Sequence, residues 1–116
     1  MELQELAWKY FNAAKEKGVQ EDLNNWFNKS IKAGCFLTFL LCGKVDTDYE
    51  TLSNEFYSDD KYQCDSEKGL FYNQDTFFVE RLQEFPEAWL RYASEAHYRC
   101  EPVASIIENL KNYLDN

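Results

Sequence analysis

Apolar residues recur every three to four positions along most of this chain, and this spacing predicts amphipathic helices rather than strands. The first helix is expected over residues 2–17, with Gly18 as its stop. A second helix is expected from Glu21 or Asp22 to Gly34, because apolar residues again follow the 3.6-residue period. The inward stripes of these two helices are Leu3, Leu6, Ala7, Tyr10 and Ala14, with Phe11 at the edge, and then Leu23, Trp26, Phe27, Ser30 and Ile31.

Residues 35–42 are apolar on every side, apart from Thr38. Periodicity does not distinguish a buried helix from a buried strand in a run this short. A central helix is favoured because no partner strand is evident elsewhere in the chain, and a buried strand is the alternative. Gly43 would end either element.

The second half of the chain predicts shorter helices separated by turns. A capping box, with Thr47 as N-cap and Glu50 reaching back, predicts a helix that fades at Ser58. Residues 58–74 show no clear period and are expected to form a loop, with a short hairpin around Gly69 as the alternative. Further helices are expected after Asp75 as a cap, and from Pro86 and Pro102, each as the first residue of its helix. The inward residues of these four helices are Tyr49, Leu52 and Phe56; Phe78, Val79, Leu82 and Phe85; Trp89, Tyr92, Ala93, Ala96, His97 and Cys100; and Val103, Ile106, Ile107, Leu110 and Leu114.

Together these elements predict an all-α protein in which residues 1–116 form a single domain. The expected architecture is a compact bundle of about five to six helices with a long acidic loop. A chain of 116 residues can bury a core of its own, and its 45% hydrophobic content is typical of globular proteins.

Acidic residues are concentrated in one third of the chain, from Asp46 to Glu87. This segment holds 12 of the 21 acidic residues against only three basic ones, so it accounts for the whole net charge of −9. Such a charge disfavours direct binding to nucleic acid, whose phosphates require Lys and Arg, and to anionic membranes. It favours a basic protein partner, whose association would be accelerated by electrostatic attraction. The alternative is that the acidity only keeps the protein in solution.

The predicted loop combines this charge with aromatic side chains, a composition typical of interface anchors. We expect its carboxylates to meet Arg or Lys of the partner while its rings fill pockets. An ordinary solvated face is the alternative. The residues expected to bind the partner are Tyr57, Asp59, Asp60, Tyr62, Asp65, Glu67, Phe71 and Tyr72.

The sequence contains no motif that indicates catalysis or a bound cofactor. His97 and Cys100 could meet on one helix face as base and nucleophile, but both lie on the predicted buried stripe, which favours packing. The spacing of the four cysteines matches no zinc pattern, and the calcium-like run that begins at Asp46 lacks the required Gly and Glu. We therefore expect a protein that is not an enzyme and holds no metal.

The first residues do not combine a basic segment with an apolar run, so no signal peptide is predicted. The longest apolar run, residues 35–42, is too short to cross a bilayer. We therefore expect a cytoplasmic protein with reduced thiols and no membrane contact.

In its length, acidity, helical pattern and lack of a catalytic motif, the chain resembles the small acidic immunity proteins that neutralise bacterial toxins of the colicin and contact-dependent growth inhibition type. This resemblance of general character implies a monomer or weak homodimer that inhibits a basic, nuclease-type toxin by covering its active or substrate-binding site. The alternatives are a small enzyme that uses His97 and Cys100, and a phage-encoded inhibitor or adaptor of a nucleic-acid-binding complex.

Overall fold

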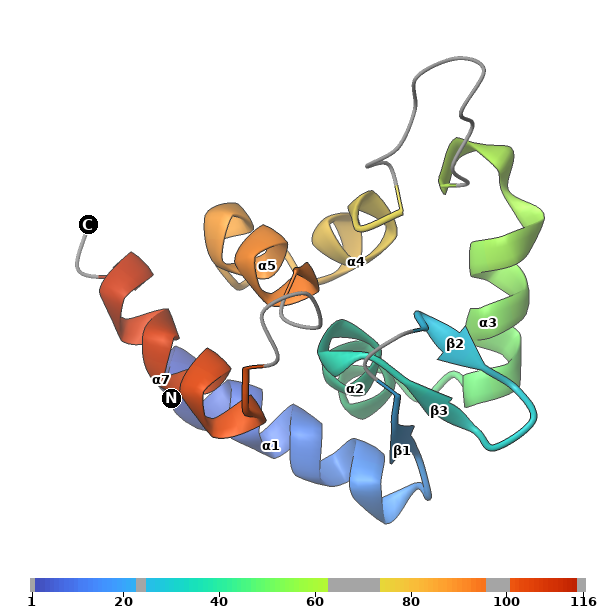
Figure 1. Cartoon of the computed structure of the whole chain (residues 1–116), viewed down its shortest axis with the longest axis horizontal. Coiled ribbons are helices and arrows are strands. Elements are labelled where there is room, and N and C mark those ends of the chain that lie inside the picture. The colour runs from blue at the N-terminus through green and yellow to red at the C-terminus, as the bar shows by residue number, and fades with distance from the viewer. Residues whose placement is uncertain (1, 23–24, 63–73, 96–100, 115–116) are drawn as a thin grey trace.

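Helix α2 (Phe36–Lys44) lies at the centre of the structure, and the other elements surround it (Figure 1). The computed structural model describes residues 2–22, 25–62, 74–95 and 101–114, within extents of 39 × 31 × 24 Å. The other described elements are the helices α1 (Leu3–Glu16), α3 (Tyr49–Ser58), α4 (Thr76–Arg81), α5 (Glu87–Ser94) and α7 (Val103–Leu114), the short 3₁₀ helix η1 (Asp60–Tyr62), and the strands β1 (Gln20–Glu21), β2 (Phe27–Asn28) and β3 (Ala33–Gly34).

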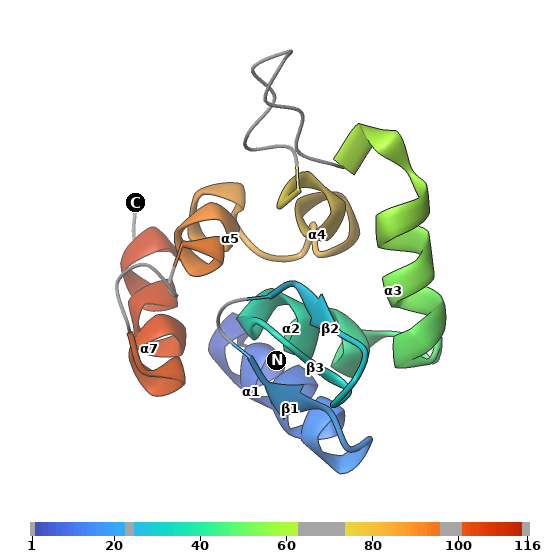
Figure 2. The ribbon, with the colours of Figure 1, turned by 45° about the vertical axis from the view of Figure 1, so that its right-hand side comes forward.

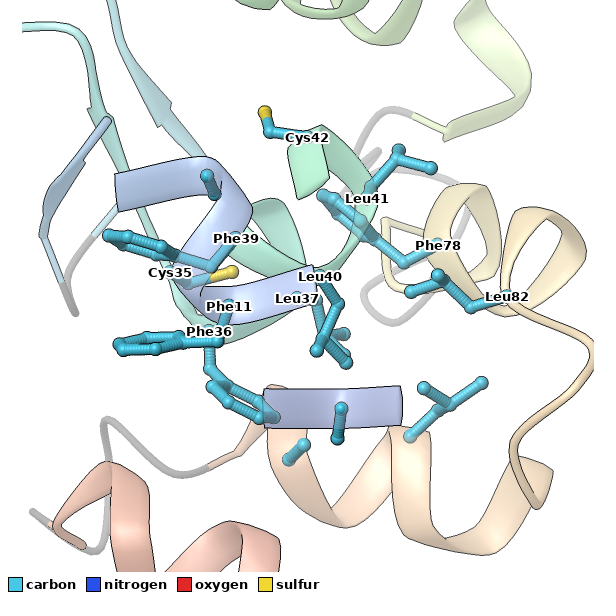
Figure 3. Packing of buried hydrophobic residues seen from close by; sticks show 14 of the residues in the cluster. Phe11, Cys35, Phe36, Leu37, Phe39, Leu40, Leu41, Cys42, Phe78 and Leu82 are labelled. Atoms are coloured by element: carbon cyan, nitrogen blue, oxygen red, sulfur yellow. The ribbon is translucent and has the colours of Figure 1, made fainter. Parts of the chain in front are cut away.

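The central apolar run is a helix, as the sequence analysis favoured. Every residue of α2 from Phe36 to Cys42 is buried, because α1, α4 and α5 cover it. The ring of Phe11 in α1 stacks on that of Phe39, with 4.7 Å between centroids (Figure 3). Gly43 allows α1 to approach closely, since a Cβ there would lie 1.7 Å from the carbonyl oxygen of Tyr10.

Three short strands occupy the described part of residues 20–34, so the helix expected from residue 21 to Gly34 is wrong. The strand order is β1-β3-β2. β3 pairs in parallel with β1, with Gln20 opposite Ala33, and antiparallel with β2, with Phe27 opposite Gly34. The protein is therefore mostly helical, as expected, but it is not all-α.

Local hydrogen bonds explain why the helical spacing was misleading here. The carboxylate of Asp22 accepts hydrogen bonds from the side-chain amides of Asn25, at 3.0 Å, and Asn28, at 2.9 Å. Short polar side chains that bond in this way compete with the hydrogen bonds of a helix. Gly34 adds a steric reason, because a Cβ there would lie 2.5 Å from the carbonyl oxygen of Trp26.

Two helix N-termini differ from the expected caps. α3 is capped by Asp48 rather than by Thr47. The Oδ1 atom of Asp48 accepts a hydrogen bond from the backbone N–H of Thr51 at 2.8 Å. Asp and Thr are both good caps, so the sequence alone left the position open by one residue. Asp75 has helical backbone angles and makes no capping hydrogen bond. Its Oδ2 atom instead pairs with Arg91 of α5 at 3.0 Å.

The inward stripe predicted after Asp75 is confirmed in large part. Phe78, Leu82 and Phe85 are buried, although α4 ends at Arg81 and a turn carries the last two. Phe77, which was not predicted to lie inward, is also fully buried. Its ring lies 5.2 Å from that of Tyr62, so this side of α4 is covered by η1.

α5 and α7 begin at Glu87 and Val103, one residue after the prolines predicted to be their first residues, and Pro86 is the N-cap of α5. The indole N–H of Trp89 donates to the carbonyl oxygen of Ile106 at 2.9 Å and links the two helices. The predicted acidic loop is described only at its two ends. Residue 58 still belongs to α3, residues 60–62 form η1, and residues 63–73 lie outside the described residues.

Candidate protein-binding surface

α3 forms one edge of the molecule, and α7 lies at the opposite edge (Figures 1 and 2). One side of α3 packs inward through Tyr49, Leu52 and Phe56, which are all buried. The ring of Phe56 lies 5.5 Å from that of Phe27 in β2 and 5.2 Å from that of Phe77 in α4. The sheet and α4 therefore hold α3 in place, and its other side is left exposed and mostly polar.

Six exposed carboxylates lie on α3, just before it and on η1. We call this set the acidic edge; its members are Asp46, Asp48, Glu50, Glu55, Asp59 and Asp60. Within the described part of the chain, none of them forms an ion pair with a lysine or arginine. The Oδ1 atom of Asp59 accepts a hydrogen bond from the backbone N–H of Lys61 at 3.0 Å. The acidic edge thus presents its negative charge to solvent.

The described acidic residues from residue 75 to residue 87 are neutralised within the molecule. Their partners are Lys61 for Glu80 and Lys44 for Glu84, both at 2.9 Å, and Arg91 for Asp75 and Glu87, both at 3.0 Å. Hydrogen bonds from Lys61 and then from Tyr62 lower the pKa of Glu80. The described part of the acidic segment therefore divides into an unpaired set around α3 and η1 and a paired set on α4 and its neighbours.

Tyr62 lies in the core rather than on the surface. Its side chain is only 5% exposed, and its hydroxyl group donates to Glu80 Oε2 at 2.8 Å. An exposed ring was predicted at this position because the surrounding residues are polar. The ring is instead buried against Phe77, which the sequence analysis did not place in the core.

Among the described residues, Tyr57 and Ile31 are large apolar side chains exposed beside the acidic edge, with 46% and 49% of their surfaces accessible. The Tyr57 ring meets that of Phe56 edge-on at 4.8 Å, and its hydroxyl group donates to the carbonyl oxygen of Phe27 at 3.2 Å. Sequence reasoning named Tyr57 but missed Ile31, which it assigned to the inward stripe of a helix. Ile31 instead lies in the turn of residues 29–32 between β2 and β3.

A hollow of about 400 Å³ opens between this turn and the start of α3, lined by Lys29, Lys32, Asp48, Tyr49 and Glu50. The Lys29 ammonium group donates to Asn54 Oδ1, and that of Lys32 donates to the carbonyl oxygen of Lys17 at 2.6 Å. Acceptors of the chain itself therefore hold both cations, whereas the Glu50 carboxylate has no ion-pair partner in the described structure.

Several residues singled out from the sequence lie outside the described residues. These are Asp65, Glu67, Phe71 and Tyr72 of the expected binding surface, together with Cys64, His97 and Cys100. The two described cysteines, Cys35 and Cys42, are free and buried. Loss of hydration on burial raises the pKa of both thiols, and that of Cys42 reaches about 12. Such thiols are poor nucleophiles, since the thiolate is the reactive form.

Within residues 2–22, 25–62, 74–95 and 101–114, no three His, Cys, Asp or Glu side chains are grouped so that they could hold a metal ion. Nor does any helix in these ranges have the length and apolar character needed to span a membrane. No protein-family model matches the chain, and no curated protein or solved structure is significantly similar to it.

Proposed function

We propose that this chain is an acidic binding protein that neutralises a basic protein partner, and that it serves as an immunity protein against a nuclease-type toxin. The observation that carries the proposal is the acidic edge, whose six exposed carboxylates have no ion-pair partner in the described part of the chain. The acids of α4 and its neighbours, by contrast, are paired with lysine or arginine.

Unpaired like charges repel one another and destabilise the folded state, and a basic partner that binds this edge would offset that repulsion. Charges spread evenly over the surface would serve solubility equally well. A concentrated edge produces a local negative field, which can raise the association rate of a basic partner roughly 10–10³-fold. The field acts over about 8–10 Å at ordinary salt concentrations.

A toxin that cleaves nucleic acid is a basic partner for a physical reason. Its substrate site must carry Lys and Arg to bind phosphates. An acidic edge would bind the same cations and exclude the substrate without imitating the shape of a nucleic acid. An ordinary interface would take roughly 800 Å² from each partner, an area that the side of a molecule of this size can supply.

Copurification followed by a growth assay tests this proposal. The tagged chain should copurify at low salt with one cationic protein from its native cells. Expression of that protein alone should arrest bacterial growth, and coexpression of the chain should restore it. Replacement of Glu55 and Asp60 by Lys should weaken the rescue, because both belong to the acidic edge.

Glu108→Lys is the matched control, since Glu108 is an exposed carboxylate on α7, at the opposite edge (Figure 1). This variant should rescue growth as well as the parent does. An acidic partner, or a toxic partner whose growth arrest the chain does not relieve, would contradict the proposed function.

A further inference from the structure

Two of the four large apolar side chains that are more than a third exposed in the described structure lie beside the acidic edge. They are Ile31, at 49%, and Tyr57, at 46%. The other two, Trp8 on α1 and Leu114 on α7, have similar exposures of 38% and 45%. This second pair lies away from α3 and provides a natural comparison.

Glu50, Asn54 and Tyr57 share one side of α3, because positions four and three residues apart face the same way on a helix. The hairpin formed by β2 and β3 lies beside the N-terminal half of α3 (Figure 2). Lys29 donates to Asn54 Oδ1 from the hairpin turn, and Tyr57 donates to the carbonyl oxygen of Phe27 in β2. The turn that carries Ile31 is therefore fixed against the side of α3 that carries Tyr57.

These contacts hold the exposed groups in place before any partner binds. The Tyr57 ring is held by the edge-on contact with Phe56 and by its hydroxyl hydrogen bond. Side chains that are already ordered lose less conformational entropy on binding, so they make better anchors than mobile ones. Exposed Tyr side chains are also enriched among residues that dominate binding energy.

The hollow of about 400 Å³ at the start of α3 adds a recess to this surface. Its two lysines are engaged by acceptors of the chain, whereas the Glu50 carboxylate is exposed and unpaired among the described residues. The two lysines keep their positive charge, because both acceptors are neutral, and Glu50 adds a carboxylate that a basic side chain of the partner can pair with.

We infer that Ile31, Tyr57 and the adjoining hollow form the docking surface for a cationic protein that presents an apolar contact surrounded by Arg or Lys. This inference rests on the proposed function and names the part of the molecule that performs it. The six carboxylates of the acidic edge make the surface complementary to such a partner. A symmetric pair of copies of this chain would instead bring two acidic edges together, which is electrostatically unfavourable.

Site-specific photo-crosslinking in native cells tests the location. The photoreactive residue p-benzoyl-phenylalanine should replace Thr51 or Ser58, which are exposed on α3, and, as controls, Ala104 or Lys111, which are exposed on α7. Both α3 positions should capture the same cationic protein, and the α7 positions should not. Capture of a second copy of this chain, capture only from α7, or no capture from α3 would each overturn the inference.

Dissociation rates of the captured protein test the two anchors. Ile31→Ser and Tyr57→Ser should each raise the dissociation rate roughly tenfold or more, as loss of a binding anchor does. Leu114→Ser and Trp8→Ser are matched controls of similar exposure and should leave the rate unchanged. Equal effects of all four substitutions would overturn the docking surface.

The two proposals can fail separately. A toxic cationic protein that copurifies and is neutralised, but is crosslinked only from α7, would leave the proposed function standing and remove this docking surface.

Circular dichroism of each variant should show the parent's helical content, because all four side chains lie partly in solvent. A variant that unfolds is replaced by the milder Ile31→Val or Tyr57→Phe, for which a smaller rise in dissociation rate is expected.

Discussion

The hydroxyl group of Tyr62 donates a hydrogen bond to Glu80 Oε2 at 2.8 Å and so ties η1 to α4. The Tyr62 ring lies 5.2 Å from the ring of Phe77. The guanidinium group of Arg81 lies 5.6 Å from the centroid of the Tyr62 ring. Tyr62 thus fixes the short helix that carries Asp60 of the acidic edge. Tyr62 therefore stabilises the acidic edge from the protein core.

Replacement of Tyr62 should therefore reduce stability. Tyr62→Ala should lower the free energy of unfolding by about 3–5 kcal/mol, the usual cost of deleting a buried aromatic ring. Tyr62→Phe should cost about 1 kcal/mol, because it removes only the hydroxyl hydrogen bonds, one donated to Glu80 and a longer one accepted from Arg81. Equilibrium denaturation in urea measures both values, with the half-exposed Tyr57→Ala as a control of smaller effect. A Tyr62→Ala protein as stable as the parent would contradict the core position of the ring.

Gly43 is expected to tolerate no side chain. A Cβ at this position would lie 1.7 Å from the carbonyl oxygen of Tyr10, so Gly43→Ala must push α1 away from α2. Overpacking of a well-packed contact costs roughly 1–3 kcal/mol, and the backbone position of this clash places Gly43→Ala at the upper end. Thermal unfolding should show a clearly lower Tm than for Asn12→Ala, an exposed change on α1. An unchanged Tm for Gly43→Ala would contradict the close approach of these helices.

The sequence was informative where burial alone determines structure. The run from Phe36 to Cys42 has no polar side to expose, and it forms the central helix. The sequence was misleading around residues 20–34, where side-chain hydrogen bonds of Asp22 and the close approach at Gly34 favour strands despite helical spacing. Ile31 was misplaced for the same reason.

Part of the candidate surface could be predicted, and part could not. The concentration of acids was visible in the sequence, but their division into paired and unpaired sets was not. That division depends on Lys44, Lys61 and Arg91, which come from separate elements and are brought to their partners only by the fold. A count of charges along the sequence does not detect ion pairs between residues that only the fold brings together.

Acid should weaken the contribution of Glu80 to stability. Hydrogen bonds from Lys61 and Tyr62 hold the pKa of this carboxyl below its usual value of 4.5. A lowered folded-state pKa contributes stability above the unfolded-state pKa, and this contribution is lost as the pH falls through the folded-state value. The Tm difference between the parent and Glu80→Gln should therefore shrink between pH 6 and pH 3. A difference that stays constant over this range would show that the ionised carboxylate adds nothing.

Cys35 and Cys42 should resist thiol reagents in the native protein. Both thiols are buried, and desolvation raises their pKa, to about 12 for Cys42. Labelling with iodoacetamide, mapped to each position by mass spectrometry, should be slow in buffer and rapid in denaturant. Labelling of either residue in buffer at the rate of an exposed cysteine would contradict its burial.

The most direct test of a binding function for the acidic edge is the salt dependence of the association rate with the copurified partner. The parent should associate fast at low salt and lose rate steeply as salt is added, because exposed charges steer the encounter. A variant with Glu55→Lys and Asp60→Lys should associate more slowly with a flatter salt dependence, while Glu108→Lys on α7 should behave like the parent. Identical association rates and salt dependences for all three proteins would contradict the account.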